Sequence, residues 1–93
     1  MELFSLDDRD VLVVNYNKKY YALDNTCPHA GGKLSSGTLE GNIVTCPRHG
    51  SKFNITTGMG VSGPKYGPFT GKVRDLEVYE TKIEDDTLKI YLD

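Results

Sequence analysis

Apolar residues in this chain gather in short runs rather than in helical patterns. Val11-Leu12-Val13-Val14 is a continuous apolar run, and Tyr20-Tyr21-Ala22-Leu23 follows it after the polar stretch 15–19. No stretch of eleven or more residues keeps a 3.6-residue apolar period, so the pattern predicts no amphipathic helix. Two such runs joined by a short polar segment predict a β-hairpin.

The C-terminal part of the chain shows the same arrangement. Residues 76–83 predict a long strand, and the polar stretch 84–87 predicts a turn. Residues 88–92 then alternate between apolar and polar, so we expect Leu88, Ile90 and Leu92 to face a core. Shorter strands are predicted at 43–45 and 52–55. The pattern as a whole predicts an all-β, antiparallel fold with short strands and Gly-rich connections.

Residues 58–71 depart from this pattern. The stretch holds five glycines and two prolines, so we expect a long loop there. A loop of this length in so small a domain is more often functional than a mere linker.

Length and composition indicate one soluble globular domain. The chain has 93 residues, of which 38% are hydrophobic and 26% charged. No stretch approaches eighteen apolar residues, so we expect no membrane helix. Residues 1–8 lack the basic start and apolar stretch of a signal peptide, and a cytoplasmic location is the default expectation.

The net charge of −2 hides an uneven distribution. Residues 27–74 hold six basic residues against one acidic residue, a balance of +5, whereas the rest holds five basic and twelve acidic residues, a balance of −7. This is either an ordinary solvated surface or a dipole that turns a basic end toward an acidic partner. The cations are too scattered to predict nucleic-acid binding.

The candidate chemistry lies in two short boxes. Cys27-Pro28-His29 and Cys46-Pro47-Arg48-His49 contain the only cysteines and the only histidines of the chain, with sixteen residues between His29 and Cys46. Thiolate and imidazole are ligands that iron and zinc prefer. A chain that places all such side chains in two matched boxes is predicted to build a metal centre.

Three arrangements of these four residues are open. The two cysteines could form a disulfide, but the adjacent histidines argue against it. A structural zinc site commonly pairs like ligands in each knuckle, whereas each box here mixes one cysteine with one histidine. This alternation is better suited to a two-iron cluster, in which both thiolates hold one iron and both imidazoles hold the other.

The spacing Cys-x-His, then Cys-x-x-His-Gly, resembles the Rieske [2Fe–2S] pattern, and the chain resembles a Rieske-type ferredoxin over nearly its whole length. Further segments around the boxes agree with the resemblance: residues 21–23, Leu34, residues 37–39, Phe53 and residues 57–58. Gly67-Pro68 resembles the proline loop that caps the cluster, although Gly63-Pro64 could take that place.

The resemblance implies a fold and a set of roles. We expect a small antiparallel β-sandwich with a cluster-binding subdomain of loops and short strands, within a single domain of residues 1–93. The cluster-binding part would span about 24–70, and the base strands about 1–23 and 71–93. The cofactor would be one [2Fe–2S] cluster per chain, held by Cys27 and Cys46 on the inner iron and by His29 and His49, through Nδ1, on the outer iron. The residues expected around the cluster are Ser51, Leu34, Gly67 and Pro68.

Two departures from high-potential Rieske proteins bear on the reduction potential. The positions of their extra disulfide are occupied here by Arg48 and by Gly32 or its neighbour, and Phe53 stands where they have a tyrosine that hydrogen-bonds sulfur. Fewer hydrogen bonds to sulfur stabilise the reduced state less. We therefore expect a potential in the lower half of the Rieske range, which spans about −150 to +300 mV.

The function implied is a one-electron carrier rather than an enzyme, exchanging electrons with a flavin-dependent ferredoxin reductase and a terminal oxygenase or another redox acceptor. The alternatives are a small Rieske subunit of a larger oxygenase or nitrite reductase, and a zinc-stabilised interaction module. No histidine remains for the mononuclear iron of a complete oxygenase. We expect a monomer that docks an acidic patch of its partner, around His29 and His49. The expected apolar contacts are Leu34, Pro47, Met59 and Phe69, and the expected cations are Lys33, Arg48, Lys52 and Lys65.

Overall fold

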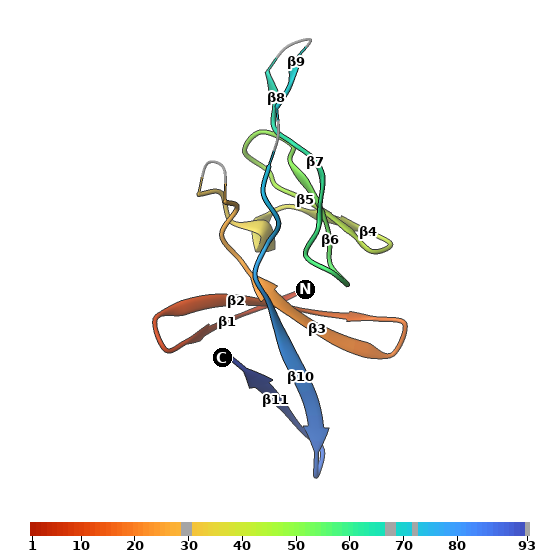
Figure 1. Ribbon diagram of the computed structural model, residues 1–93. Coiled ribbons are helices and arrows are strands. Elements are labelled where there is room, and N and C mark those ends of the chain that lie inside the picture. The colour runs from red at the N-terminus through yellow and green to blue at the C-terminus, as the bar shows by residue number, and fades with distance from the viewer. Residues whose placement is uncertain (29–30, 67–68, 72, 93) are drawn as a thin grey trace.

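Antiparallel β-structure dominates the computed structural model, which describes residues 1–28, 31–66, 69–71 and 73–92 (Figure 1). The first sheet has the order β1-β2-β3-β10-β11, with bounds Glu2–Leu6, Arg9–Tyr16, Lys19–Asp24, Val78–Glu84 and Thr87–Tyr91. The second has the order β4-β5-β6-β7, with bounds Thr38–Glu40, Ile43–Thr45, Lys52–Asn54 and Gly60–Ser62. The pair β8 (Lys65–Tyr66) and β9 (Phe69–Thr70) forms a third. The predicted all-β class is confirmed.

The sheets follow one another along an elongated molecule of 50 × 28 × 19 Å. Figure 1 shows the five-stranded sheet as a base, the four-stranded sheet beyond it, and β8–β9 projecting at the far end. The helical structure of the described ranges is a single 3₁₀ turn, η1 (Leu34–Ser36). No described helix has the length and apolar character needed to cross a membrane.

The continuous apolar run in β2 has a physical cause, because this strand is buried on both faces. Successive side chains of a strand point to opposite faces. Val11 and Val13 pack into a cluster with Ala22 and Tyr79, whereas Leu12 and Val14 pack into a larger cluster on the other face. The predicted inward residues of the last strand, Leu88, Ile90 and Leu92, pack against the first of these clusters, as expected.

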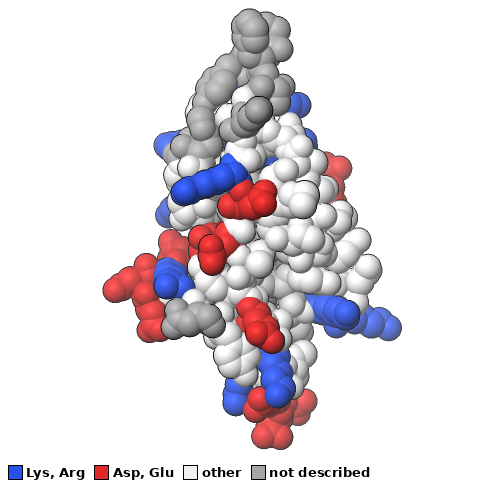
Figure 2. Space-filling view, viewed as in Figure 1, with Lys and Arg blue, Asp and Glu red and all other residues white. Residues whose placement is uncertain are grey.

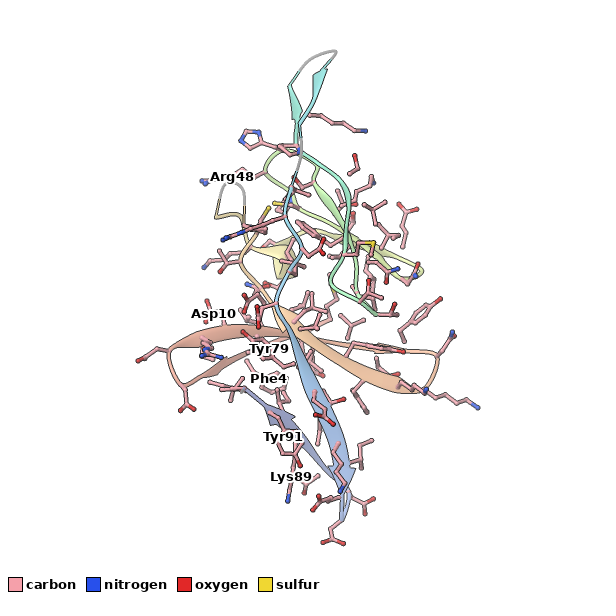
Figure 3. All side chains as sticks on the ribbon, in the orientation of Figure 1. Phe4, Asp10, Arg48, Tyr79, Lys89 and Tyr91 are labelled. Atoms are coloured by element: carbon pink, nitrogen blue, oxygen red, sulfur yellow. The ribbon has the colours of Figure 1, made fainter. Side chains whose placement is uncertain are left out.

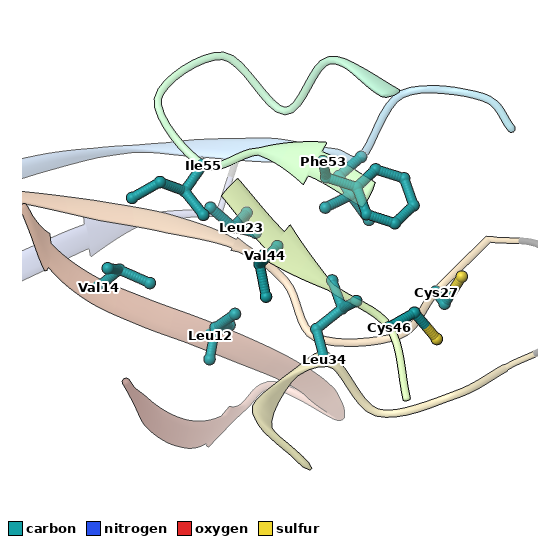
Figure 4. Packing of buried hydrophobic residues seen from close by; sticks show 10 residues of the cluster. Leu12, Val14, Leu23, Cys27, Leu34, Val44, Cys46, Phe53 and Ile55 are labelled. Carbon is teal, nitrogen blue, oxygen red and sulfur yellow. The ribbon is translucent and has the colours of Figure 1, made fainter. Parts of the chain in front are cut away.

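The larger cluster joins the two main sheets and reaches the metal boxes. Its buried members are Leu12, Val14, Leu23, Cys27, Leu34, Val44, Cys46, Phe53, Ile55 and Leu76. The base sheet supplies its first three residues, and β5, β6 and the turn after β6 supply Val44, Phe53 and Ile55. Figure 4 shows both cysteines at one end of this cluster, next to Leu34. The boxes are therefore built onto the core.

The predicted hairpin of residues 11–23 is confirmed, and a second hairpin was missed. β2 and β3 pair from Val11↔Asp24 to Tyr16↔Lys19 around a two-residue turn. Asn17 and Lys18 have φ of 53° and 66°, the left-handed values that such a turn requires. β1 pairs with β2 around an equivalent turn at Asp7 and Asp8. β1 contains Leu3, Phe4 and Leu6, but they do not alternate regularly with polar residues, and most of the strand is exposed.

Two predicted bounds are corrected. The stretch 58–71, expected to be a loop, contains β7, β8 and β9. Its glycines allow close packing, since a Cβ at Gly60 would lie 2.9 Å from the Val73 carbonyl oxygen. The strand predicted from residue 76 begins at Val78, because the Leu76 N–H is already committed to the Gly58 carbonyl at 2.7 Å.

A polar network links three strands of the base sheet, one of which, β3, leads into the first box. Tyr79 on β10, labelled in Figure 3, donates a hydrogen bond from its hydroxyl to the Asp24 carboxylate at the end of β3. Arg9 on β2 lies over the Tyr79 ring, 5.9 Å from its centre. Burial, followed by the hydrogen bond to Asp24, raises the pKa of Tyr79 from 10.0 to about 12. Neutral Tyr79 is thus favoured in the folded state.

We expect the free energy of unfolding to fall between about pH 10 and pH 12. The folded-state pKa of Tyr79 is raised, so its contribution is complete below pH 10 and is lost as the pH approaches 12. Tyr79→Phe should flatten this slope and cost about 1–2 kcal/mol at neutral pH, because the Asp24 carboxylate loses a donor. Urea unfolding from pH 7 to 12 measures both effects. Tyr91→Phe, on an exposed tyrosine, is the control. Equal slopes in wild type and Tyr79→Phe would contradict the prediction.

Candidate metal centre

The two boxes fold in the same way around their cysteines. The Cys27 N–H donates to the Gly32 carbonyl at 2.8 Å, and the Cys46 N–H donates to the Ser51 carbonyl at 2.8 Å. In return, the N–H four residues further on donates to each cysteine carbonyl: Gly31 to Cys27 at 3.0 Å and Gly50 to Cys46 at 3.2 Å. Each box is therefore a tight loop closed on both sides of its cysteine.

A glycine at the same position makes both loops possible. Gly31 and Gly50 each stand four residues after a cysteine, with φ of 68° and 78°. Such left-handed values favour glycine because a Cβ would crowd the following carbonyl oxygen. The shared loop geometry confirms that the two boxes are a matched pair.

The loops bring the two thiols together in the interior. Cys27 and Cys46 are both free and each only 2% exposed. Burial is the largest influence on the Cys46 thiol and raises its pKa, and the neighbouring Cys27 side chain raises it further. The backbone N–H groups of Arg48 and His49 act in the opposite direction, because they hydrogen-bond the Cys46 sulfur. The disulfide alternative is thus not formed, and the pair is arranged as two adjacent sulfur ligands.

Donor groups around the thiols suit a sulfur-rich metal group. Ser51 is 1% exposed, and its hydroxyl is one of two buried side-chain groups without a hydrogen-bond partner among the described residues. Such a hydroxyl in the second loop is suited to donate to a thiolate or sulfide. Gly32 leaves room beside the ligands, since a Cβ there would lie 2.7 Å from the Cys46 sulfur. The residues present therefore fit an iron–sulfur group.

Of the two expected imidazole ligands, the structure describes His49, which lies at the surface. His49 is exposed, and its carbonyl accepts a hydrogen bond from the Lys65 N–H at 2.8 Å, which ties the second box to β8. His29, Gly67 and Pro68 lie outside the described residues. Gly63 and Pro64, the alternative capping step, are buried just before β8.

Gly32 and Arg48, which were compared above with the disulfide positions of high-potential Rieske proteins, lie close together in the structure. A Cβ at Gly32 would lie 3.2 Å from the Arg48 Cβ, so residues 32 and 48 face each other across the two loops. A Cβ at the neighbouring Gly31 would meet nothing within 4 Å, so Gly32 is the glycine of the pair that lies against Arg48. Phe53, which cannot donate a hydrogen bond, is fully buried in the same core cluster as the cysteines.

The expected docking face needs one correction, at Leu34. Leu34 is fully buried and cannot contact a partner, whereas Pro47 and Met59 are exposed. The side chain of Phe69 lies outside the described part of the structure. Leu34 nevertheless packs in one cluster with Cys27 and Cys46, so it lies close to the candidate centre.

Acidic residues also lie closer to the first box than the chain order indicates. Asp24, Asp75 and Glu77 line a surface hollow together with Cys27 and Arg74. Figure 2 shows acidic and basic side chains interspersed over the visible face, without a patch of a single sign. Of the cations expected around the centre, Lys33 is exposed beside the first box and Lys65 is exposed on β8.

Two residues that shape the site were not recognised from the sequence. Gly37 enters β4 where a Cβ would lie 1.9 Å from the Thr45 carbonyl oxygen, next to the second box. Asn25 is fully buried two residues before Cys27. A glycine outside a turn is a weak signal for close backbone approach, and no sequence signal separates Asn25 from a surface asparagine.

Comparison with known proteins was made for the whole chain. The sequence model of the Rieske [2Fe-2S] domain matches residues 1–89. Ferredoxin CarAc of Metapseudomonas resinovorans is 41% identical over 70 residues, which cover 72% of this chain and 65% of that protein. The ferredoxin component of the 2,4-dinitrotoluene dioxygenase system of Burkholderia sp. (strain RASC) is 36% identical over 73 residues, or 78% and 64% of the two chains. The chain thus spans just under two thirds of the length of both relatives.

A solved structure agrees with these sequence relatives. A chain in the complex of reduced oxygenase and oxidized ferredoxin in carbazole 1,9a-dioxygenase superimposes with a TM-score of 0.74 at 30% identity, covering 95% of this chain and 83% of that one. The fold predicted from the resemblance is confirmed.

We expect Ser51→Ala to lower the reduction potential of the bound cluster. The Ser51 hydroxyl is the buried donor available to sulfur in the second box, and a hydrogen bond to sulfur stabilises the reduced state. The wild-type value itself should lie in the lower half of the range of about −150 to +300 mV. A redox titration of both proteins measures the two values. Ser62→Ala, on β7, is the control. A wild-type value above about +200 mV, near the top of that range, or an unchanged value in Ser51→Ala, would contradict this assignment.

Proposed function

The chain belongs to the family of Rieske [2Fe-2S] domains, and from this premise we propose that it is a one-electron carrier between a reductase and a terminal oxidoreductase. The observation that carries the proposal is the pair of matched loops, which bury two free thiols side by side and leave His49 exposed. Such a centre is insulated on one side and accessible on the other.

We assign the ligands by their position in the two loops. Cys27 and Cys46 would hold the inner iron, and His29 and His49 the outer iron. The burial of both thiols and the N–H groups directed at the Cys46 sulfur support the inner pair. When bound, one [2Fe–2S] cluster per chain supplies a single-electron redox couple. The protein supplies the ligands, excludes water from the thiolates and exposes the histidine edge.

The relatives indicate the class of partner. Two of them are named as ferredoxins or ferredoxin components, one of them of a dioxygenase system, and a structural neighbour was solved in a complex with its oxygenase. We propose that this chain accepts an electron from a flavin-dependent reductase and passes it to an oxygenase or another redox acceptor. The chain itself carries no substrate chemistry in this proposal. We also propose that the protein is a monomer and lies in the cytoplasm. The two free cysteines are compatible with such a reducing compartment.

Metal analysis and EPR spectroscopy test the cofactor. We expect purified protein to contain two irons and two acid-labile sulfides per chain and to give the EPR signal of a mixed-ligand cluster after reduction by dithionite. Cys46→Ser should lose most of the iron, because one of the two buried thiolates is removed. Ser36→Ala, on η1, is the control, because it should keep the wild-type iron content through the same purification. A content of one zinc per chain without acid-labile sulfide would contradict the electron carrier and favour the zinc-stabilised interaction module.

Electron transfer should slow as the ionic strength rises. Lys33 and Lys65 are exposed beside the two boxes, and we propose that they attract an acidic patch of the partner. Lys33→Glu with Lys65→Glu should lower the association rate several-fold at low salt and reduce its salt dependence. Lys19→Glu, on the base sheet, carries the same change of charge per site and should have a smaller effect. Stopped-flow transfer to the oxygenase measures the rates. A rate that is constant or rises with salt would remove the steering role.

A further inference from the structure

We propose that Asn25 is a positioning residue of the metal centre, whose side chain closes the neck of the first cysteine loop and thereby fixes Cys27 against Cys46. This inference rests on the proposed cluster, since it assigns a role toward that group. It concerns a residue that binds no metal itself.

The two loops differ in how their necks are held. The second box lies between β5 and β6, whose ladder reaches its neck at the pair Thr45↔Lys52. The first box leaves β3 and enters η1, and among the residues described between these ends the strand-like pairing is the single bridge Thr26↔Lys33. A strand ladder holds the second loop, and the first loop needs another closure.

Asn25 adds that closure through its side chain, and its backbone forms two further hydrogen bonds, one of which belongs to the Thr26↔Lys33 bridge. Its N–H donates to the Asp10 carbonyl on β2 at 2.9 Å, which ties it to the base sheet. Its carbonyl accepts from the Leu34 N–H at 2.8 Å, and its side-chain Oδ1 accepts from the Ser35 N–H at 2.8 Å. The entrance of the loop is thus joined to its exit through both the backbone and the side chain of Asn25.

The residues that Asn25 joins are fixed by the hydrophobic core. Leu34 is fully buried in the core cluster that contains Cys27 and Cys46, so η1 cannot shift without opening that core. Only one residue separates Asn25 from Cys27. A loosened neck would therefore move the Cys27 sulfur directly.

The chemistry of the position favours asparagine. The side chain is fully buried, and its Nδ2 group has no hydrogen-bond partner among the described residues. An unpaired buried donor is destabilising. A leucine of similar size would avoid that cost but could not accept the Ser35 N–H. An aspartate would accept it but would bury a charge.

Three variants separate positioning from general stability. Asn25→Leu removes the acceptor, and Asn25→Asp keeps an acceptor at Oδ1. Asn54→Leu is the matched control, because Asn54 Oδ1 also accepts a backbone N–H, that of Thr56 at 2.9 Å, but in the turn after β6. Urea unfolding first gives the midpoint concentration of each protein. Each protein is then reconstituted with iron and sulfide at a urea concentration below that midpoint, where it is folded. The readouts are iron and sulfide content, the EPR spectrum after reduction, and the rate of iron loss to a chelator.

The expected result is specific to Asn25→Leu. Iron loss should accelerate at least tenfold and the EPR spectrum should shift or broaden, whereas Asn25→Asp and Asn54→Leu should keep the wild-type spectrum. If Asn25→Leu does not fold, Asn25→Ala against Asn54→Ala provides the same comparison.

Two outcomes would overturn the inference. One is a wild-type spectrum and wild-type iron retention in Asn25→Leu, and the other is equal damage in Asn25→Leu and Asn25→Asp. Failure of the proposed cofactor is recognised separately, because wild type and Asn54→Leu would then also lack iron and sulfide.

Discussion

The burial of two adjacent thiols at the end of a shared hydrophobic core is the constraint on which this structure depends. A thiolate loses hydration in the interior, which is why burial raises the pKa of Cys46. Holding both sulfurs as thiolates there requires compensating positive charge and directed N–H groups. The backbone of the second loop supplies the N–H groups, and a metal would supply the charge. As thiolates, the two buried cysteines are therefore unfavourable without a bound cation and favourable with one.

The base sheet explains how so small a chain can bear this cost. β2 is buried on both faces, so one strand contributes to two clusters at once, and one of those clusters also contains both cysteines. Displacement of a box would therefore open the core that joins the two main sheets. A metal bridging the boxes would in turn cross-link the segments that follow β3 and β5. Core and centre stabilise each other, which suits a domain of 93 residues.

The elements that could be predicted from the sequence are those whose buried residues are apolar or whose residues are typical metal ligands. The apolar runs predicted β2, β3 and the last two strands, and the mixed cysteine and histidine boxes predicted the two loops. β1 was missed although it contains Leu3, Phe4 and Leu6, because these residues do not alternate regularly and the following turn uses Asp7 and Asp8 without a glycine. The glycines of residues 58–71 predicted a loop, but Gly58 and Gly60 allow the chain to pack closely against residues 73–78. Asp75 and Glu77 were counted with the acidic flank along the chain, although they lie beside Cys27 in space.

The asymmetry of the centre also limits how the proposed carrier can work. Its thiol side faces the core of the protein, so electrons must enter and leave through the edge that includes His49. Donor and acceptor must then use the same edge in turn, and each complex must dissociate before the next can form. Small contact areas suit such short-lived encounters. The exposed Lys33 and Lys65 beside the boxes would serve the same end, because they orient a partner on approach without adding a large apolar contact.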